Sequence, residues 1–387
     1  MRITFFSNFL NHHQLPFCLE MYEKLGEDFK FIATEPIHAE RLQMGYEDMS
    51  KKYPFSLNTY NDKKSYEKAV RLGTESDVVI IGSASDNFIR KRLKEDKLTF
   101  RYSERIFKKG RYRVLNPRLF ISLVKKHTRY RSKQVYMLCA SAYTAADFNL
   151  VGAYKNKAYK WGYFPEVKMH SLEILMKKKK HEVTKILWVG RLLNLKHPDH
   201  AVKVASMLKN KGYSFELNII GSGEMEEYLR ELIQKHDLMN CVKLLGSMTP
   251  EQVRKYMEGS NIYLFTSDYN EGWGAVLNEA MNSGCAVVAS HAVGSVPFLM
   301  RNRENGLIYK SGDLNELFKC TQILLEDREL CNELGREACK TLNETWNAKE
   351  AAKRFISLSE SILKDKRIEF EEGPCSKAEV ISQKYDY

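Results

Sequence analysis

A long hydrophobic run is missing from the 387-residue sequence. No stretch approaches the roughly 20 apolar residues that a membrane-spanning helix needs. The N-terminus does not resemble a signal peptide, because Met1-Arg-Ile-Thr-Phe-Phe-Ser reads as a first buried strand. With 43% hydrophobic and 28% charged residues, the composition is that of a soluble globular protein. The length predicts two domains.

Closely spaced cysteines are also missing. The eight cysteines are scattered and form no CxxC pair, so neither a zinc cage nor a redox pair is indicated, and a reducing cytoplasm fits best. There is no Walker lysine pattern, no motif context for a Ser/His/Asp or Cys/His constellation, and no Asp-x-Asp pair. We therefore expect no cofactor and no metal.

Acidic residues are scarce in one segment. The whole chain carries a net charge of +12, but residues 90–133 hold 17 Lys and Arg against three acids, a net charge of +14. The rest of the chain is close to neutral, so an acidic partner for one face is indicated. The alternatives are a solvated basic surface, an anionic membrane surface that carries a lipid-linked acceptor, and a nucleic acid that stacks on the aromatic residues of this segment.

Apolar strands alternate with amphipathic segments along the whole chain, which predicts an α/β fold with parallel, doubly wound sheets. In the first half the expected strands are residues 3–7, 29–34, 78–82, 134–140 and 158–163, with a further short strand at 100–105. Helical spacing covers 15–25, 66–72 and 88–93. In the second half the expected strands are residues 186–189, 216–220, 242–245, 262–266, 286–289 and 307–309. The expected helices there are 199–208, 225–236, 250–257, 313–325, 328–341 and 348–363.

A domain boundary is predicted after residues 161–165, where the strand pattern ends and a lysine-rich stretch follows. The expected domains are residues 1–170 and 183–345. A last helix at about 346–364 is expected to pack back on the first domain. The tail at 365–387 lacks periodicity and is expected to be mobile unless it docks.

The stretch from Asp268 to Ser290 lies between two buried strands and carries two carboxylates, Glu271 and Glu279. If Glu271 precedes a short helix and Glu279 lies inside it, both can face one ligand. The adjacent glycines let the backbone of Trp273, Gly274 and Ala275 approach that ligand. The alternative is a ligand-free strand-to-helix turn with two surface glutamates, which is common in α/β proteins.

Other strand ends carry matching chemistry. After the first strand of the second half, an arginine fork and a lysine point charge suit a diphosphate, although each alone is more often a solvated surface charge. Two glycines open a phosphate-type turn after the next strand, without the third Gly of a dinucleotide motif. In sequence order these candidates are Gly190, Arg191, Lys196, Gly221, Gly223 and Gly246.

In the first half, His12 and His13 follow the first strand. Adjacent side chains diverge and no spaced ligand joins them, so a helix cap or a ligand contact is favoured over a metal site. The serines at 83 and 85 follow the strand 78–82, and Ser85 is a candidate N-cap for a helix at Asp86. Glu104 and Arg105 form either a surface pair or part of an acceptor site.

At this point the second half resembles the retaining glycosyltransferases of family 4, also called group 1, over about residues 184–345. The motifs that carry the resemblance are Gly190-Arg191 with Lys196, Gly221-Ser-Gly, Val242-Lys-Leu-Leu-Gly246, Glu271-Gly-Trp-Gly-Ala-Val-Leu-Asn-Glu279, Gly294 before Pro297, and Asn305-Gly306-Leu307. The first half resembles the family only in layout.

The resemblance implies a GT-B fold, in which two Rossmann-like domains face each other across a cleft, and a nucleotide-sugar donor linked to UDP or GDP. It implies that Arg191 and Lys196 bind the donor diphosphate, that Glu271 contacts the donor sugar, and that Glu279 holds the ribose hydroxyls. The backbone at 273–275 would face the sugar and phosphates, and the turn at Gly246 would border the base.

One departure from the family pattern lies in the first half. Related enzymes often carry a His after an N-terminal strand, where this chain has Ser83 and Ser85. His12, His13 and Glu104 are left as candidates on the acceptor side.

The sequence therefore predicts a cytoplasmic glycosyltransferase that docks peripherally on the inner face of the cell membrane. It is expected to act on a glycan or lipid-linked acceptor in cell-surface polysaccharide or glycolipid synthesis. One rival is a nucleotide-sugar 2-epimerase of the same architecture, for which no acid/base residues can be assigned. A rival of another class is a nucleic-acid-binding protein that uses residues 90–133, although no recognised module is present.

Overall fold

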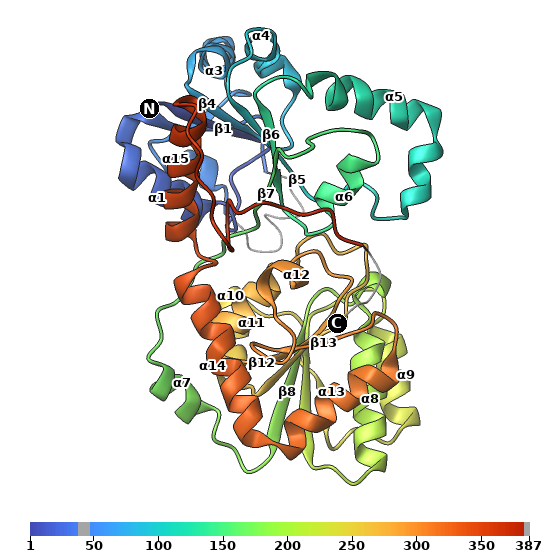
Figure 1. The fold of residues 1–387 in the computed structure, drawn as a ribbon. Coiled ribbons are helices and arrows are strands. Elements are labelled where there is room, and N and C mark those ends of the chain that lie inside the picture. Colours follow the sequence, from blue (N-terminus) through green and yellow to red (C-terminus); the bar gives the residue numbers. More distant parts are fainter. Residues whose placement is uncertain (38–46, 383–387) are drawn as a thin grey trace. The chain divides into compact units, whose positions relative to one another are not determined.

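The computed structural model describes residues 1–37 and 47–382, which fold into two compact units (Figure 1). The first unit contains residues 1–166 and 347–382, and the second contains residues 167–346. Each unit is built on its own parallel β-sheet. Within the described residues, no helix is both long and apolar enough to cross a bilayer.

The sheet of the first unit has the strand order β3-β2-β1-β4-β5-β6-β7, which reverses direction between β1 and β4. All of its neighbouring strands are parallel, and the core is rich in phenylalanine. Its strands are β1 (Ile3–Ser7), β2 (Phe29–Ala33), β3 (Ser56–Asn58), β4 (Val78–Ile81), β5 (Thr99–Ser103), β6 (Val135–Cys139) and β7 (Ala158–Lys160).

Six α-helices belong to the described part of this unit. They are α1 (Leu15–Leu25), α3 (Lys63–Glu75), α4 (Arg90–Lys94), α5 (Pro117–Lys126), α6 (Thr144–Asn149) and α15 (Ala348–Leu363). Asn347 caps α15 by accepting a hydrogen bond from the Glu350 amide at 2.9 Å. This last helix lies against α1 (Figure 1). Its Phe355 side chain is completely buried. The Phe355 ring is 5.0 Å from that of Phe100 and 5.7 Å from that of Trp161.

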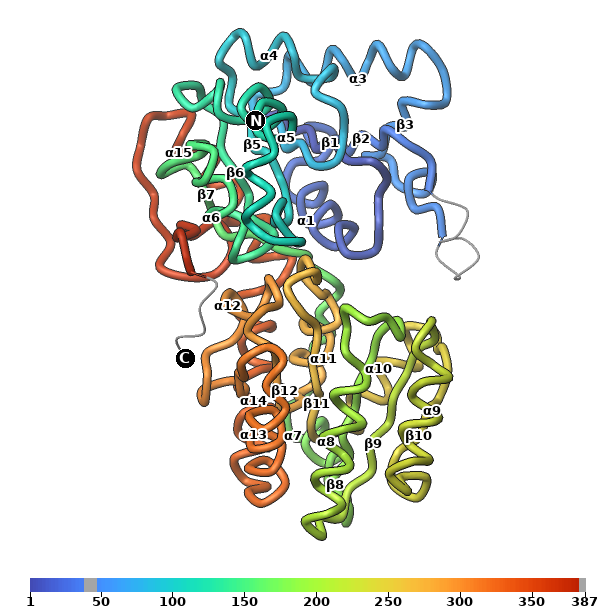
Figure 2. The backbone as a smooth tube through the Cα atoms, turned by 90° about the vertical axis from the view of Figure 1, so that its right-hand side faces the viewer, coloured from blue at the N-terminus to red at the C-terminus, as the bar shows by residue number. Residues whose placement is uncertain are grey.

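The tail after α15 is docked rather than mobile as far as residue 382, and the expectation for 383–387 lies outside the described residues. Lys160 donates a backbone hydrogen bond to Ser376 at 2.7 Å, and Cys375 donates one back to Lys160 at 2.8 Å. Figure 2 shows this red segment returning beside β7. The tail thus covers the open edge of the sheet, where unpaired backbone groups would otherwise face water.

The sheet of the second unit has the order β10-β9-β8-β11-β12-β13, the arrangement of a Rossmann fold. Its strands are β8 (Thr184–Val189), β9 (Phe215–Ile220), β10 (Val242–Leu244), β11 (Ile262–Phe265), β12 (Ala286–Ser290) and β13 (Leu307–Tyr309). Its helices are α7 (Leu172–Lys178), α8 (Pro198–Asn210), α9 (Glu226–Lys235), α10 (Pro250–Gly259), α11 (Val276–Asn282), α12 (Val296–Leu299), α13 (Leu314–Glu326) and α14 (Arg328–Glu344).

Most predicted elements are confirmed within a few residues, and α1, α15 and β13 match the expected bounds. The sequence did not predict β3, α5, α6, α7 or α12. These elements are short or follow dense positive charge, and local contacts with the rest of the fold decide them more than periodicity does.

Candidate functional site

Four neighbouring strands bring the predicted donor-side residues to one edge of the second sheet. In sheet order these are Gly246 after β10, Gly221 and Gly223 after β9, Gly190, Arg191 and Lys196 after β8, and Glu271 after β11. The strand order reverses between β8 and β11, and ligands of open parallel sheets bind beyond the carboxyl ends at such a point. Lys196 and Glu271 lie on its two sides.

The glycines at this edge allow the loops after β8 and β9 to approach closely. A Cβ at Gly221, where φ is +143°, would lie 1.8 Å from the Gly190 carbonyl oxygen, and one at Gly223 would lie 2.5 Å from that of Leu192. Gly221 also donates to the Gly246 carbonyl at 2.8 Å. Close backbone packing, which only glycine permits here, therefore builds the floor of the edge.

Lys196 and Glu271 form an ion pair across the point of reversal. Glu271 also accepts a hydrogen bond from Ser267 at 3.3 Å, and the Thr266 hydroxyl donates to the Lys196 carbonyl at 2.7 Å. The Lys196 ammonium has three N–H donors, so it can hold Glu271 and still donate to another oxygen. Arg191 is exposed and makes no ion pair with residues of 1–37 or 47–382.

Glu279 lies in α11, one turn beyond the loop that carries Glu271. Burial raises the pKa of the Glu279 carboxyl, and the positive charges of Arg254 and Lys168 offset part of that rise. Arg254 donates to the Glu279 carbonyl at 2.9 Å and to the side chain of Asn282. A carboxylate in this position is costly to keep charged and would gain from hydroxyl donors.

The loop between the two carboxylates is fixed from behind. Trp273 is fully buried, and its indole N–H donates to Asn278 Oδ1 at 2.9 Å. Gly274 has φ of +74°, and a Cβ there would lie 2.4 Å from the Phe265 ring. Ala275 is the N-cap of α11. The Trp273 side chain is thus part of the core, which leaves the backbone at 273–275 as the part available to a ligand.

One group of side chains in the described segments could offer three metal ligands. The ligand atoms of His197, Asp199 and His200 lie within 4.8 Å of one another. Lys203 already donates to Asp199 at 2.7 Å, and burial lowers the pKa of His200 to about 4, which keeps its imidazole neutral. The sequence-based expectation that no metal is needed stays a prediction.

In the first unit, Tyr163 connects two of the predicted acceptor-side residues. The His13 ring stacks on that of Tyr163 at 5.7 Å, and the Tyr163 hydroxyl donates to Glu104 at 2.6 Å. The expectation that the side chains of His12 and His13 diverge is wrong, because their ring centroids are 3.7 Å apart. Neither residue caps α1, whose N-cap is Gln14. Sequence reasoning did not select Tyr163. It lies just after the carboxyl end of β7, and ligands of parallel sheets bind beyond the carboxyl ends of the strands.

The alternative of a Glu104–Arg105 surface pair is wrong. Arg105 is buried and pairs instead with Asp147 at 3.3 Å. Glu104 pairs with Lys108 at 2.5 Å. Arg105 therefore organises the interior of the first unit, while Glu104 remains accessible at the carboxyl end of β5.

The capping alternative for Ser85 is confirmed. Its hydroxyl accepts a hydrogen bond from the Asn87 amide at 3.3 Å and starts the 3₁₀ turn Asp86–Phe88. Asp86 then receives both guanidinium nitrogens of Arg101, at 2.8 and 2.9 Å. The pKa of Asp86 is lowered, because the bond and charge of Arg101 outweigh its partial burial.

The match to a known protein family lies in the second unit. Residues 173–341 match the family model of the glycosyl transferases group 1. A glycosyltransferase of amylovoran biosynthesis from Erwinia amylovora is 34% identical over 142 residues, which are 35% of either chain. An uncharacterized glycosyltransferase from Haemophilus influenzae is 34% identical over 145 residues, 38% of this chain and 40% of that one. The chain thus spans well under half the length of these relatives.

A solved structure covers both units. The crystal structure of Anabaena HepE in complex with UDP superimposes with a TM-score of 0.66 at 14% identity, over 94% of this chain and 99% of that one. At this identity the likeness concerns the fold alone. The architecture is GT-B, with two Rossmann-like domains.

Proposed function

Because residues 173–341 match the family model of the glycosyl transferases group 1, we propose that the chain is a glycosyltransferase that moves a sugar from a nucleoside diphosphate to an acceptor. The ion pair between Lys196 and Glu271, held across the point where the strand order reverses, carries this proposal. It gives one place both a cation for a departing diphosphate and a carboxylate for the sugar. We assign it to family 4, with retention of the anomeric configuration.

The donor is a nucleotide sugar linked to UDP or GDP. Arg191 and Lys196 bind its diphosphate, because a guanidinium fork and an ammonium together stabilise the charge that develops as the sugar leaves. Glu271 contacts the sugar, and Glu279 accepts hydrogen bonds from the ribose hydroxyls. Backbone groups at 273–275, and the turns at Gly190, Gly221, Gly223 and Gly246, surround the rest of the nucleotide.

The acceptor is a glycan or a lipid-linked glycan of cell-surface polysaccharide or glycolipid synthesis. The relative from Erwinia amylovora, named for amylovoran biosynthesis, supports this class. In the first unit, His12, His13 and Glu104 form the acceptor side, and Tyr163 joins His13 to Glu104. We place the protein in the cytoplasm, docked on the inner face of an anionic membrane through residues 90–133.

Transfer is expected to proceed without a cofactor or added metal. Two fixed cations can stabilise the diphosphate in place of a divalent ion. Activity should therefore survive EDTA, whereas strict dependence of the transfer step on magnesium or manganese would overturn this mechanism.

The test is a panel of nucleotide sugars, preceded by thermal-shift screening with UDP, GDP and ADP. A nucleotide that binds only the folded state raises the melting temperature, which selects the donor series. Transfer or slow hydrolysis of the matching nucleotide sugar supports the proposal. Epimerisation of the sugar without an acceptor would identify a 2-epimerase instead, and no reaction with any donor would reject both enzymes.

A further inference from the structure

We propose that a basic pocket between α4 and α5 binds the phosphate-bearing headgroup of an anionic membrane lipid, while apolar side chains of η4 and α5 enter the lipid surface. The 3₁₀ turn η4 spans Arg111–Leu115. This inference rests on the membrane docking of the proposed function and names the residues that perform it.

The structure separates the cations of residues 90–133 into two groups. Some serve the fold: Arg92 is fully buried and donates to four backbone carbonyls, Arg101 pairs with Asp86, and Arg105 with Asp147. These internal cations add little to the surface. The others make no ion pair with any described residue, namely Arg90, Lys94, Lys109, Arg113, Arg118, Lys125, Lys126, Arg129 and Arg131.

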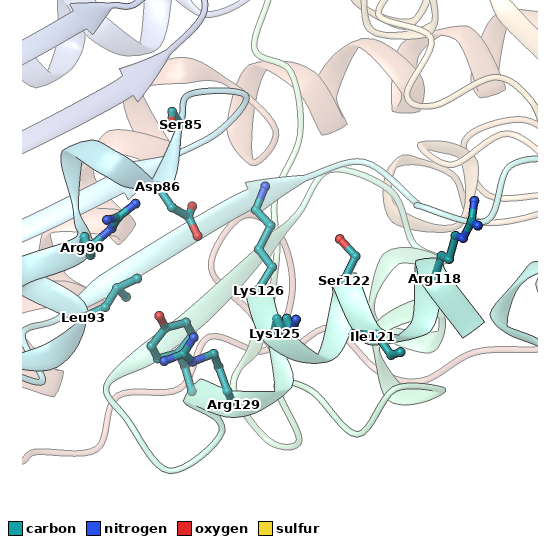
Figure 3. Close-up of a pocket in the computed structure, with 11 residues that line it drawn as sticks. Ser85, Asp86, Arg90, Leu93, Arg118, Ile121, Ser122, Lys125, Lys126 and Arg129 are labelled. Atoms are coloured by element: carbon teal, nitrogen blue, oxygen red, sulfur yellow. The ribbon is translucent and has the colours of Figure 1, made fainter. Parts of the chain in front are cut away.

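Five of these unpaired cations line one open pocket of about 800 Å³ (Figure 3). Arg90 comes from α4, Arg118, Lys125 and Lys126 come from α5, and Arg129 comes from the next turn. The lining contains one carboxylate, that of Asp86, which Arg101 already neutralises. Several convergent cations with no free counter-charge suit a phosphate group, which accepts bidentate and charge-assisted hydrogen bonds.

One exposed apolar side chain lines the same pocket, and three others lie close to it in the sequence. Ile121 lines it and is 52% exposed, and Phe120 beside it is 40% exposed. On η4, Tyr112 and Leu115 are 71% and 80% exposed. These four are among the large apolar side chains that the described structure leaves in water, and they lie within ten residues of one another.

A surface that combines cations with exposed apolar residues fits a membrane interface better than it fits the other anions. A soluble phosphate needs no apolar neighbours, whereas an interfacial helix buries such residues at the headgroup boundary. A nucleic acid could stack on Tyr112 and Phe120, which are exposed, but not on Phe100 and Phe107, which are fully buried. The exposed aliphatic side chains of Leu115 and Ile121 offer a base nothing to stack on, whereas a lipid surface takes them up. The structure therefore favours lipid over RNA or free phosphate.

The experiment measures binding of the full chain to phosphatidylcholine vesicles with and without phosphatidylglycerol. The pocket variant is Lys125→Ala with Arg129→Ala, and the matched control is Lys94→Ala with Arg131→Ala, because these two residues neither line the pocket nor belong to η4. Both pairs remove two exposed cations that make no ion pair with a described residue. The pocket variant should weaken binding to anionic vesicles by about thirtyfold and the control by much less. Equal losses would overturn the pocket and leave general electrostatic docking.

The apolar part has its own variant, Leu115→Ser with Ile121→Ser. It should weaken vesicle binding by about tenfold or more without changing the net charge. Unchanged vesicle binding would reject insertion. Soluble glycerol phosphate should bind far more weakly than the vesicles, and equal affinity would identify a soluble ligand instead. A single-stranded RNA that loses affinity in the pocket variant, while vesicle binding persists, would also overturn the proposal.

Nucleotide-sugar turnover in solution keeps this test separate from the proposed activity. All these variants should retain the thermal shift with the donor nucleotide, because the altered residues belong to the first unit and the donor residues to the second. Turnover without vesicle binding would reject the docking alone. Vesicle binding without turnover would reject the transferase alone.

Discussion

Glu271 and Glu279 lie eight positions apart and answer to different neighbours. Glu271 is bound to Lys196, whereas burial dominates at the Glu279 carboxyl, and the positive charges of Arg254 and Lys168 offset only part of it. The two carboxylates should therefore respond differently to neutralisation, and each response can be measured separately.

The first prediction concerns Glu271→Gln. Glu271 is assigned to the donor sugar, which UDP lacks, so UDP affinity should change less than about threefold, while turnover falls by roughly a hundredfold to a thousandfold because the sugar loses its carboxylate. Calorimetry with UDP and a transfer assay give the two numbers. Lys196→Ala is the matched control and should weaken UDP binding. Loss of UDP binding in Glu271→Gln would show that this residue is assigned to the wrong part of the donor.

The second prediction concerns Glu279→Gln. Because its pKa is raised, the Glu279 carboxyl binds a proton more readily in the folded state than in the unfolded state. This residue therefore lowers the free energy of unfolding more and more as pH rises from the unfolded-state pKa to the folded-state pKa. Glu279→Gln should therefore melt at a higher temperature than wild type at neutral pH, and the difference should shrink as pH falls. The same variant should bind the donor nucleotide more weakly. Thermal unfolding across pH, with and without nucleotide, measures both effects.

Among the elements, α5 ends on a histidine that cannot easily take up a proton. His127 contacts the Tyr154 hydroxyl at 2.6 Å and the Phe148 ring at 4.7 Å. Burial, with the positive charges of Arg101 and Lys126, lowers the pKa of His127 from 6.5 to about 3. The first unit thus holds a neutral imidazole where the unfolded chain would be charged.

The third prediction follows from that difference. Below pH 6.5 the unfolded chain binds a proton at His127 that the folded chain does not, so the first unit should lose about 1.4 kcal/mol per pH unit from this residue, down to about pH 3. His127→Gln cannot titrate, so the stability advantage of wild type should narrow by that amount as pH falls. Urea unfolding followed by Trp161 fluorescence measures it. A gap that stays constant with pH would contradict the buried neutral state.

The fourth prediction compares two glycine turns. Gly221→Ala would force a Cβ against a backbone oxygen at 1.8 Å, so the strand ends must separate and stability should fall by more than about 3 kcal/mol. Gly246→Ala meets nothing within 4 Å, and only its φ of +71° is strained, so it should cost about 1–2 kcal/mol. The difference in the free energy of unfolding between the two variants, measured by urea unfolding, gives the cost of the steric clash at residue 221 beyond that of a positive φ. Similar costs would mean that the loops relax apart easily.

At the element scale, the sequence predicted the elements that carry a regular apolar pattern. It missed the elements and residues whose structure depends on contacts with distant parts of the chain. Strands such as β1 and β13 could be located because continuous apolar runs between turn residues indicate buried parallel strands. The helix α5 was not predicted, because its exposed positions hold apolar side chains, Phe120 and Ile121, as well as cations, so its apolar residues mark no single covered face. Tyr163 and Arg254 were missed at the site because their roles depend on partners that are distant in the sequence. Their partners lie 59 and 25 residues away in the chain.

Charge counted along the chain was a coarser guide than charge located in the fold. The excess in residues 90–133 pointed to an anionic partner, but Arg92 and Arg105 belong to the interior, and Lys108 and Arg111 already pair with Glu104 and Asp147. No local pattern distinguishes an arginine that holds backbone carbonyls from one that faces solvent. The surface cations could be identified only after the fold was known.

At the scale of the whole molecule, the two units differ in how they use the chain. Among the residues that the structure describes, the second unit is one continuous segment, whereas the first is completed by α15 and the docked tail from the far end of the sequence. The rings of Phe17, Phe100 and Trp161 surround Phe355 of α15. The core of the first unit therefore depends on residues that follow the second.

The fifth prediction uses this difference. A chain cut after Trp346 should keep the thermal shift with the donor nucleotide, because the second unit is intact, while the first unit loses the burial of Phe355 and unfolds at a lower temperature. Calorimetry with and without nucleotide follows both units. A cut after Leu363, which removes only the tail, is the control and should have a milder effect. Loss of the nucleotide shift in a folded second unit would mean that donor binding needs the first unit.

The late position of α15 also sets an order of events on the ribosome. Translation at roughly 5–20 residues per second separates the last strand of the first sheet from the helix that covers it by about ten to forty seconds. During that interval the apolar surface on which Phe355 packs is exposed to solvent, while the second unit can already fold. The part of the protein that is made first therefore matures last, and a nascent chain halted before residue 347 would present that surface to chaperones.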